Sequence, residues 1–167
     1  GYVSENYMLW GPFVIALFFF LMLLGGCAGS TSCGLKIFRL QILFKQITVQ
    51  TKKVAYPDAV LVPLYNGKEI NESIIRSVVS FFLLFLLVFF VVGLLLSVLG
   101  SDPITSFSAS ASALANVGPG LGHIVGPTET YANMGVYAKW LLSFAMLLGR
   151  LEIFTVFVIF TAYFWRQ

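Results

Sequence analysis

The residues with the clearest chemical potential are the seven of Asn116–Gly122, Asn-Val-Gly-Pro-Gly-Leu-Gly, hereafter the glycine-rich loop. They follow a run of small and hydroxyl residues, Ile104–Ala115, and lie between two segments that are apolar enough for lipid. Irregular backbone is costly at membrane depth, because exposed amides and carbonyls find no water there, and it survives where protein packs around it or where it lines a wet cavity. The pattern therefore indicates a pore.

A loop of this kind can bind a cation through its backbone. Carbonyl oxygens replace the water around the ion without a fixed charge, so that the ion can leave again, and glycine tolerates the backbone angles that turn successive carbonyls toward one axis. The glycine spacing matches the Thr-Val-Gly-Tyr-Gly loop of potassium channels. The predicted carbonyl ligands are Asn116, Val117, Gly118, Pro119 and Gly120, with a potassium ion at the first three. The alternative is an ordinary turn between two helices.

A second unusual segment is Gly25–Gly34, ten consecutive small residues in the middle of an otherwise helical pattern, hereafter the small-residue stretch. Gly25 and Gly29 form a GxxxG pair, so close helix packing is one interpretation. Packing needs small residues on one face only, whereas here every face is small. We therefore expect a broken helix whose loop can occupy or vacate the ion path.

Arg150 lies near the centre of the last apolar segment, and an ionisable residue at that depth is a functional hypothesis by default. Glu152 is two residues away, so a helix directs it to the opposite side. Lys139 lies eleven residues earlier and shares the face of Arg150. The positive charge of Arg150 would hold the carbonyls of the broken stretch or set a barrier to the ion. A structural ion pair with another helix is the alternative.

Composition sets the class of protein. Hydrophobic residues make up 59% of the chain and charged residues 10%, which leaves too little polar surface for a soluble domain of this length. The first residues lack an initiator Met and a basic segment, which suggests a piece of a larger membrane protein. Cys27 and Cys33 are read as small packing residues and His123 as a solvated loop residue. Because no nucleophile–base pair or metal-ligand cluster is present, we expect no enzyme activity.

The expected fold is an all-α membrane protein, in which a helix–pore helix–helix repeat follows one additional broken transmembrane helix. The predicted segments, in chain order, are a first helix at 9–24 continued through the loop 25–34 to residue 49, a connector at 50–72, an outer helix at 73–99, a pore helix at 104–115, the loop at 116–122 and an inner helix at 131–165. The helix at 104–115 is too short to cross a bilayer, so it must enter and return from one side.

Basic residues predict the orientation. Seven of the ten Lys and Arg residues lie between the first and second spans, which makes that connector cytoplasmic by the positive-inside rule. The loops around Asp102 and Glu129 are then outside, and Arg166 returns to the cytoplasm.

Three motifs in this order resemble the membrane subunit of Trk-type potassium uptake systems, in the Trk/Ktr/HKT superfamily. The motifs are Gly25–Thr31, the glycine-rich loop, and Lys139–Glu152 with the sequence Lys-Trp-Leu-Leu-Ser-Phe-Ala-Met-Leu-Leu-Gly-Arg-Leu-Glu. That family has four tandem helix–pore helix–helix repeats around one potassium path. The resemblance covers nearly the whole chain, with residues 9–49 as the second helix of repeat three and 73–167 as repeat four.

The resemblance implies several roles. It assigns Gly1 to the end of the third filter, Arg150 to the pore-facing basic residue, and the small-residue stretch to a gate beneath the filter. The corresponding gate residues are Gly25, Gly26, Gly29, Ser30, Thr31, Gly34 and Arg150. The family works as a homodimer in the plasma membrane, the inner membrane of bacteria, with a cytoplasmic nucleotide-binding regulatory ring as partner. It transports potassium as its substrate and has no nucleic-acid partner. One departure is Ser32-Cys33, where the family pattern has Gly-Gly.

Two other functions fit the composition less well. A non-conducting membrane scaffold has no need of a short capped helix that ends in a glycine loop. A broken-helix transporter of an organic solute would want polar side chains at the break, where this loop offers mostly backbone. The choice between a channel and proton- or sodium-coupled transport stays open at this point, as does selectivity for potassium over sodium.

Overall fold

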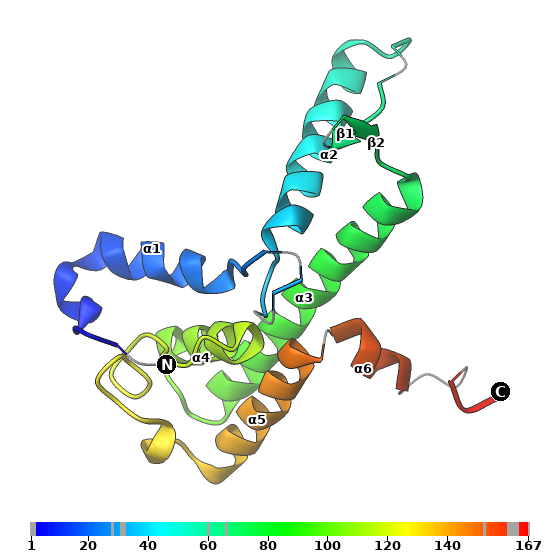
Figure 1. Ribbon diagram of the computed structural model, residues 1–167. Helices are drawn as coiled ribbons and strands as arrows, with labels where there is room; N and C mark the ends of the chain where they lie inside the picture. The colour runs from blue at the N-terminus through cyan, green and yellow to red at the C-terminus, as the bar shows by residue number, and fades with distance from the viewer. Residues whose placement is uncertain are drawn as a thin grey trace.

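A computed structural model describes residues 3–27, 29–30, 33–59, 61–65, 67–151, 153–159 and 164–166. Within this part the chain is mostly helical and has one small hairpin (Figure 1).

The chain begins with a 3-10 turn at Tyr7–Trp10 (η1) and helix α1 at Pro12–Leu23. Proline is favoured at the first helical position, because the N–H that it lacks would have no helical partner there. Helix α1 has 12 residues, fewer than the roughly 20 that a straight crossing needs. Regular helix returns only with α2, Ile37–Ala55, so an irregular segment that contains the small-residue stretch separates the two helices.

Helix α2 ends at Ala55, so the first residues of the predicted connector are helical and the predicted boundary at residue 49 is wrong. The hydroxyls of Thr48 and Thr51 donate to carbonyls one turn earlier (2.8 and 2.9 Å), and two lysines lie in the last turn, where cations favour the helix end. The helix stops just before Pro57, because a residue that precedes proline avoids the helical conformation.

The connector contains an antiparallel hairpin of β1 (Leu64–Tyr65) and β2 (Lys68–Glu69). Gly67 has a φ of +76°, which glycine adopts easily in a tight turn. The ammonium of Lys45 in α2 donates to the Leu64 carbonyl (2.5 Å). The hairpin is thus attached to the side of α2.

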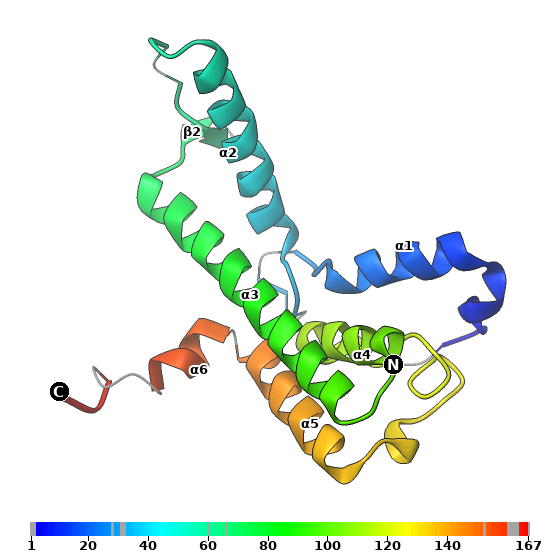
Figure 2. The ribbon, with the colours of Figure 1, turned by 180° about the vertical axis from the view of Figure 1, so that it is seen from behind.

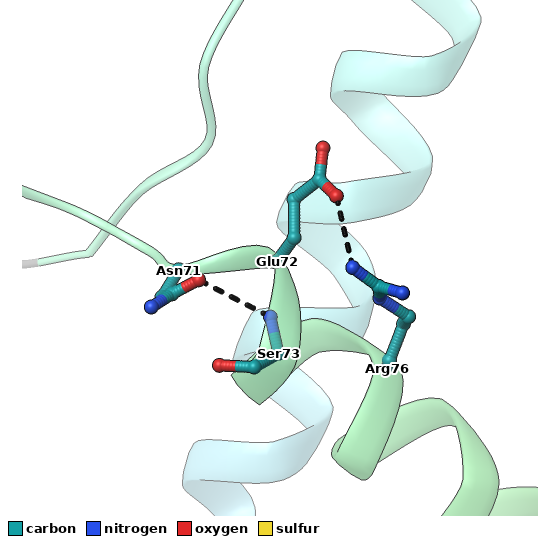
Figure 3. A network of polar contacts seen from close by, with 4 residues as sticks. All are labelled: Asn71, Glu72, Ser73 and Arg76. Atoms are coloured by element: carbon teal, nitrogen blue, oxygen red, sulfur yellow. Dashed lines mark hydrogen bonds and ion pairs between the residues drawn. The ribbon is translucent and has the colours of Figure 1, made fainter.

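Helix α3 covers Glu72–Val98 and is the one helix in the described residues that is long and apolar enough to cross a membrane. Its start is capped by Asn71, whose side-chain oxygen accepts from the Ser73 N–H (3.3 Å), as Figure 3 shows. Glu72 and Arg76 form an ion pair one turn apart (3.3 Å). Both charges are exposed, so this pair contributes little, and the cap is the stronger signal for the helix start.

The core forms where helix α4 (Pro103–Ala115) packs against α3 and α5 (Val136–Arg150), as both ribbon views show (Figure 2). Ten of the 13 residues of α4 are buried, so this short helix is packed inside protein, as a helix of its composition requires. Small residues permit the close approach: a Cβ added to Gly93 in α3 would lie 2.6 Å from the ring of Phe107 in α4.

The last helix, predicted as continuous over 131–165, is interrupted in the described residues. The elements are η2 at Tyr131–Asn133, α5 at Val136–Arg150, α6 at Ile153–Ile159 and η3 at Phe164–Arg166. Figure 1 shows α6 leaving α5 at a bend. Gly149, a poor helix former, precedes the bend. Beyond it Ile153 is buried, and the ring of Phe154 lies 6.1 Å from that of Phe81 in α3. The prediction of one continuous helix is therefore wrong, because packing against α3 draws α6 aside.

Candidate functional site

Serines of α4 hold the glycine-rich loop in place. The Ser112 carbonyl accepts from the Val117 N–H (3.0 Å), and its side-chain oxygen accepts from the Gly118 N–H (3.1 Å). The hydroxyl of Ser108 accepts from the Leu121 N–H (3.0 Å) and donates to the Leu121 carbonyl (2.9 Å). The loop therefore folds back along the helix that precedes it.

Sequence reasoning assigned these serines only to packing and missed this role. Ser108 and Ser112 are four residues apart and so share one face of a helix. Ser110 points elsewhere, and its hydroxyl donates to the Phe89 carbonyl in α3 (2.9 Å). A pair of serines one turn apart, directly before a glycine-rich loop, is the signal that could have identified the loop-facing side of α4.

Two tyrosines contact the same loop from outside α4. The Tyr131 hydroxyl in η2 donates to the Gly118 carbonyl (2.8 Å), and the Tyr7 hydroxyl in η1 donates to the Gly120 carbonyl (3.0 Å). Burial raises the pKa of both tyrosines, and for Tyr7 the neighbouring Tyr131 adds to this increase. Both hydroxyls therefore keep their protons, and remain donors, at neutral pH.

The backbone of the loop divides the predicted carbonyl ligands into two groups. Gly118 and Gly120 already accept a tyrosine hydroxyl each. Within the described part of the chain, no hydrogen-bond donor reaches the carbonyls of Asn116, Val117 and Pro119. The αL conformation of Asn116 (φ 53°) ends α4, and its amide donates to the Met146 carbonyl in α5 (3.1 Å).

Residues near the start of the chain lie beside the glycine-rich loop. A cavity of about 390 Å³ is lined by Val117 and Pro119 of the loop and, from the other side, by Val3, Ser4 and Glu5. Residues that are more than 110 positions apart in sequence therefore face one space. Gly1, the predicted ligand of the third filter, lies outside the described residues.

The small-residue stretch is a closed loop. The Gly25 N–H donates to the Leu35 carbonyl (2.9 Å), and the Leu35 N–H donates to the Leu23 carbonyl (3.0 Å). A Cβ added to Gly25 would lie 2.5 Å from the Cys33 carbonyl, so the two ends of the loop are in close contact.

The base of this loop lies against the end of α4. A Cβ added to Gly34, which has a φ of +83°, would lie 3.4 Å from that of Ala115, the last residue of α4. The small-residue stretch and the glycine-rich loop thus meet at one helix end. Of the other predicted gate residues, Gly26 is half-buried, Gly29 and Ser30 are exposed, and Thr31 lies outside the described residues.

Arg150 faces the small-residue stretch. Its guanidinium donates a long hydrogen bond to the Cys33 Sγ (4.0 Å), and both residues line a cavity of about 220 Å³ between this loop and helices α2 to α5. Lys36 and Arg39 of the α2 region line the same cavity. Sequence reasoning used these two cations only for orientation, whereas the fold gathers all three positive charges around one space.

Arg39 is held in that cavity by an aromatic ring. Its guanidinium carbon lies 3.9 Å from the centre of the Phe81 ring in α3, within the range of a cation–π contact. Lys139 lies eleven residues before Arg150 in α5, on the same face of the helix, but its ammonium donates to the Ala132 carbonyl (2.6 Å) and it does not line this cavity.

Replacing Ser108 by alanine is expected to destabilise the protein by about 1–3 kcal/mol, because the buried Leu121 N–H would lose its acceptor. Thermal denaturation of the full-length protein in detergent measures this. The matched control is Ser143→Ala, whose exposed hydroxyl bonds only to the Lys139 carbonyl in its own helix, with an expected change within about 0.5 kcal/mol. Equal midpoints for the two variants would contradict the role of Ser108.

Comparison with known proteins shows which family this chain resembles. The model of the TrkH family, described as a cation transport protein, matches residues 1–166. The Trk system potassium uptake protein TrkI of Halomonas elongata is 45% identical over 167 residues, which cover 100% of this chain and 34% of that protein. TrkH of Escherichia coli strain K12 is 37% identical, with the same coverage.

A solved structure of the same family has a similar fold. The crystal structure of the potassium transporter TrkH from Vibrio parahaemolyticus superposes with a TM-score of 0.90 at 37% identity, and the match covers 99% of this chain and 35% of that one. The chain thus spans about a third of the length of its relatives. The expected potassium-channel-like repeat fold is confirmed by this match. The chain belongs to the TrkH family, whose members are cation transport proteins and not enzymes.

Proposed function

We propose that the chain is the part of a potassium uptake protein that contains the fourth repeat and the second helix of the third. The observation that carries this proposal is the anchored glycine-rich loop at the end of α4. The negative end of that helix faces the loop, which favours a cation. The carbonyls of Asn116, Val117 and Pro119, which no donor reaches among the residues that the structure describes, are available to replace its water. The loop would be one of four contributions to a selectivity filter.

The small-residue stretch would be the gate below this filter. Its base lies against Ala115, next to the glycine-rich loop, which supports a position on the ion path. Arg150, Lys36 and Arg39 line the cavity beside it. The positive charge of Arg150 would hold the carbonyls of this loop or set an electrostatic barrier to a passing cation.

The membrane location and the partners that we propose for the full-length protein rest on the family resemblance and on the basic residues of the connector. The protein would be a multi-pass subunit of the bacterial inner membrane, with the connector and the end of α6 on the cytoplasmic side. Following the family resemblance, it would work as a homodimer with a cytoplasmic nucleotide-binding ring. Relatives named as Trk system potassium uptake proteins support potassium as the transported substrate.

Rubidium uptake tests the proposal. The full-length protein, produced in cells that lack their own potassium uptake systems, is expected to admit rubidium even with sodium in excess. The 167 residues alone are expected to carry no flux, because three further filter contributions are needed. If the full-length protein leaves rubidium uptake at the background level, the proposed function is wrong.

A further inference from the structure

Tyr7 and Tyr131 share a contact with the glycine-rich loop that the proposed ion path does not explain. They reach it from two separate turns, and their hydroxyls bond to alternate carbonyls, those of Gly120 and Gly118. The ring of Tyr7 is itself fixed, since it stacks on Phe18 of α1 with ring centres 4.7 Å apart and planes 2° apart. The Tyr7 hydroxyl is therefore carried by a ring whose position is fixed by packing.

The two hydrogen bonds lie on either side of Pro119. A peptide unit is planar, so a hydrogen bond to its carbonyl holds the whole unit. The bond to the Gly118 carbonyl holds the peptide unit between Gly118 and Pro119, and the bond to the Gly120 carbonyl holds the unit between Gly120 and Leu121. The proline ring holds its own φ near −65°. The Pro119 carbonyl shares its peptide plane with the Gly120 N–H, which donates to the Val125 carbonyl (2.6 Å), so the rotation of this carbonyl is restricted as well.

A carbonyl that accepts a hydroxyl also offers less negative charge to an ion. Asn116, Val117 and Pro119, whose carbonyls have no donor within the described residues, are then the stronger ligands. This differs from the prediction that the potassium ion lies at Asn116, Val117 and Gly118, because the Gly118 carbonyl accepts the Tyr131 hydroxyl. Selectivity depends on the number and field strength of the coordinating carbonyls, so removing either hydroxyl would change the ligand set.

We infer that Tyr7 and Tyr131 are positioning residues for ion selection, which hold the Gly120 and Gly118 carbonyls so that those of Asn116, Val117 and Pro119 meet the ion. The inference rests on the proposed function. Tyr131 lies 13 residues after the glycine that it contacts, whereas Tyr7 lies 113 residues before its own. The hydrogen bond from Tyr7 joins the loop to the turn before α1, and so joins two of the proposed repeats.

The test uses the full-length protein in vesicles and compares rubidium with sodium uptake in the same sample. Tyr131→Phe and Tyr7→Phe remove one oxygen each and keep the ring. Each is expected to lower the rubidium-to-sodium uptake ratio by about fivefold, the effect of one lost hydrogen bond. The matched control is Tyr137→Phe, because the side chain of Tyr137 is exposed and bonds to nothing in the loop; its ratio should equal that of the unmodified protein.

A purely structural role predicts a different result. Poor folding lowers the uptake of both ions together and leaves their ratio unchanged, so an unchanged ratio in both variants overturns the inference, however much protein accumulates. A changed ratio in either variant with an unchanged Tyr137→Phe supports it. If the unmodified full-length protein takes up no rubidium, the proposed function fails; if it does and the variants keep its ratio, only the positioning role fails.

Discussion

Replacing Gly149 by alanine is expected to abolish ion uptake, although alanine is the better helix former by about 1 kcal/mol. A Cβ at this position would lie 2.0 Å from the Leu114 carbonyl oxygen and 3.0 Å from the side-chain nitrogen Nδ2 of Asn116. The first contact is with backbone, which cannot rotate away as a side chain can. Helix α5 must then move off the end of α4, at a cost of about 1–3 kcal/mol or more, and the support of the glycine-rich loop moves with it.

Rubidium uptake and thermal denaturation of the full-length protein measure the effect of Gly149→Ala. Gly135→Ala is the matched control, because a Cβ added to Gly135 meets nothing within 4 Å and its φ of −58° suits any residue. The control should keep both uptake and the denaturation midpoint. Normal uptake by Gly149→Ala would show that the close contact between α4 and α5 is not needed for transport.

Deleting residues 27–32 is expected to raise cation flux severalfold, because these residues are the middle of the small-residue stretch that we propose as the gate. The hydrogen bonds between Gly25, Leu35 and Leu23 hold the base of this loop and lie outside the deletion. The close contact between Gly25 and the Cys33 carbonyl leaves a short gap to join. The shortened chain should therefore keep α1 and α2 in place and lose only the obstruction. Rubidium uptake per unit of full-length protein is the measurement.

The control for this deletion substitutes serine and alanine for residues 27–32 while keeping their number. A loop of unchanged length should still obstruct the path, so its flux should stay near that of the unmodified protein. If deletion and substitution raise the flux equally, the effect comes from loop sequence and not from obstruction. If neither changes the flux, the small-residue stretch is not a gate.

The identity of the membrane elements could be read from local sequence. An apolar run of helical length predicts α3, and a run of small residues after Pro103 predicts a short buried helix, because each depends on composition within one segment. The glycine-rich loop was recognisable for the same reason. Errors arose at helix ends: α2 continues to Ala55 and the last helix bends after Gly149, because side-chain bonds and packing decide where a helix stops.

The sequence by itself determined that this chain lies in a membrane, that two irregular segments interrupt its helices, and that one of them has the glycine spacing of an ion-binding loop. Only the tertiary structure decided which groups meet. It places Tyr7 on Gly120, gathers Lys36 and Arg39 with Arg150, and bonds the Gly118 and Gly120 carbonyls, whereas no donor in the described part of the chain reaches that of Pro119. The physical reason is that hydrophobic patterning is local, whereas a hydrogen bond between residues 113 positions apart depends on how the helices pack.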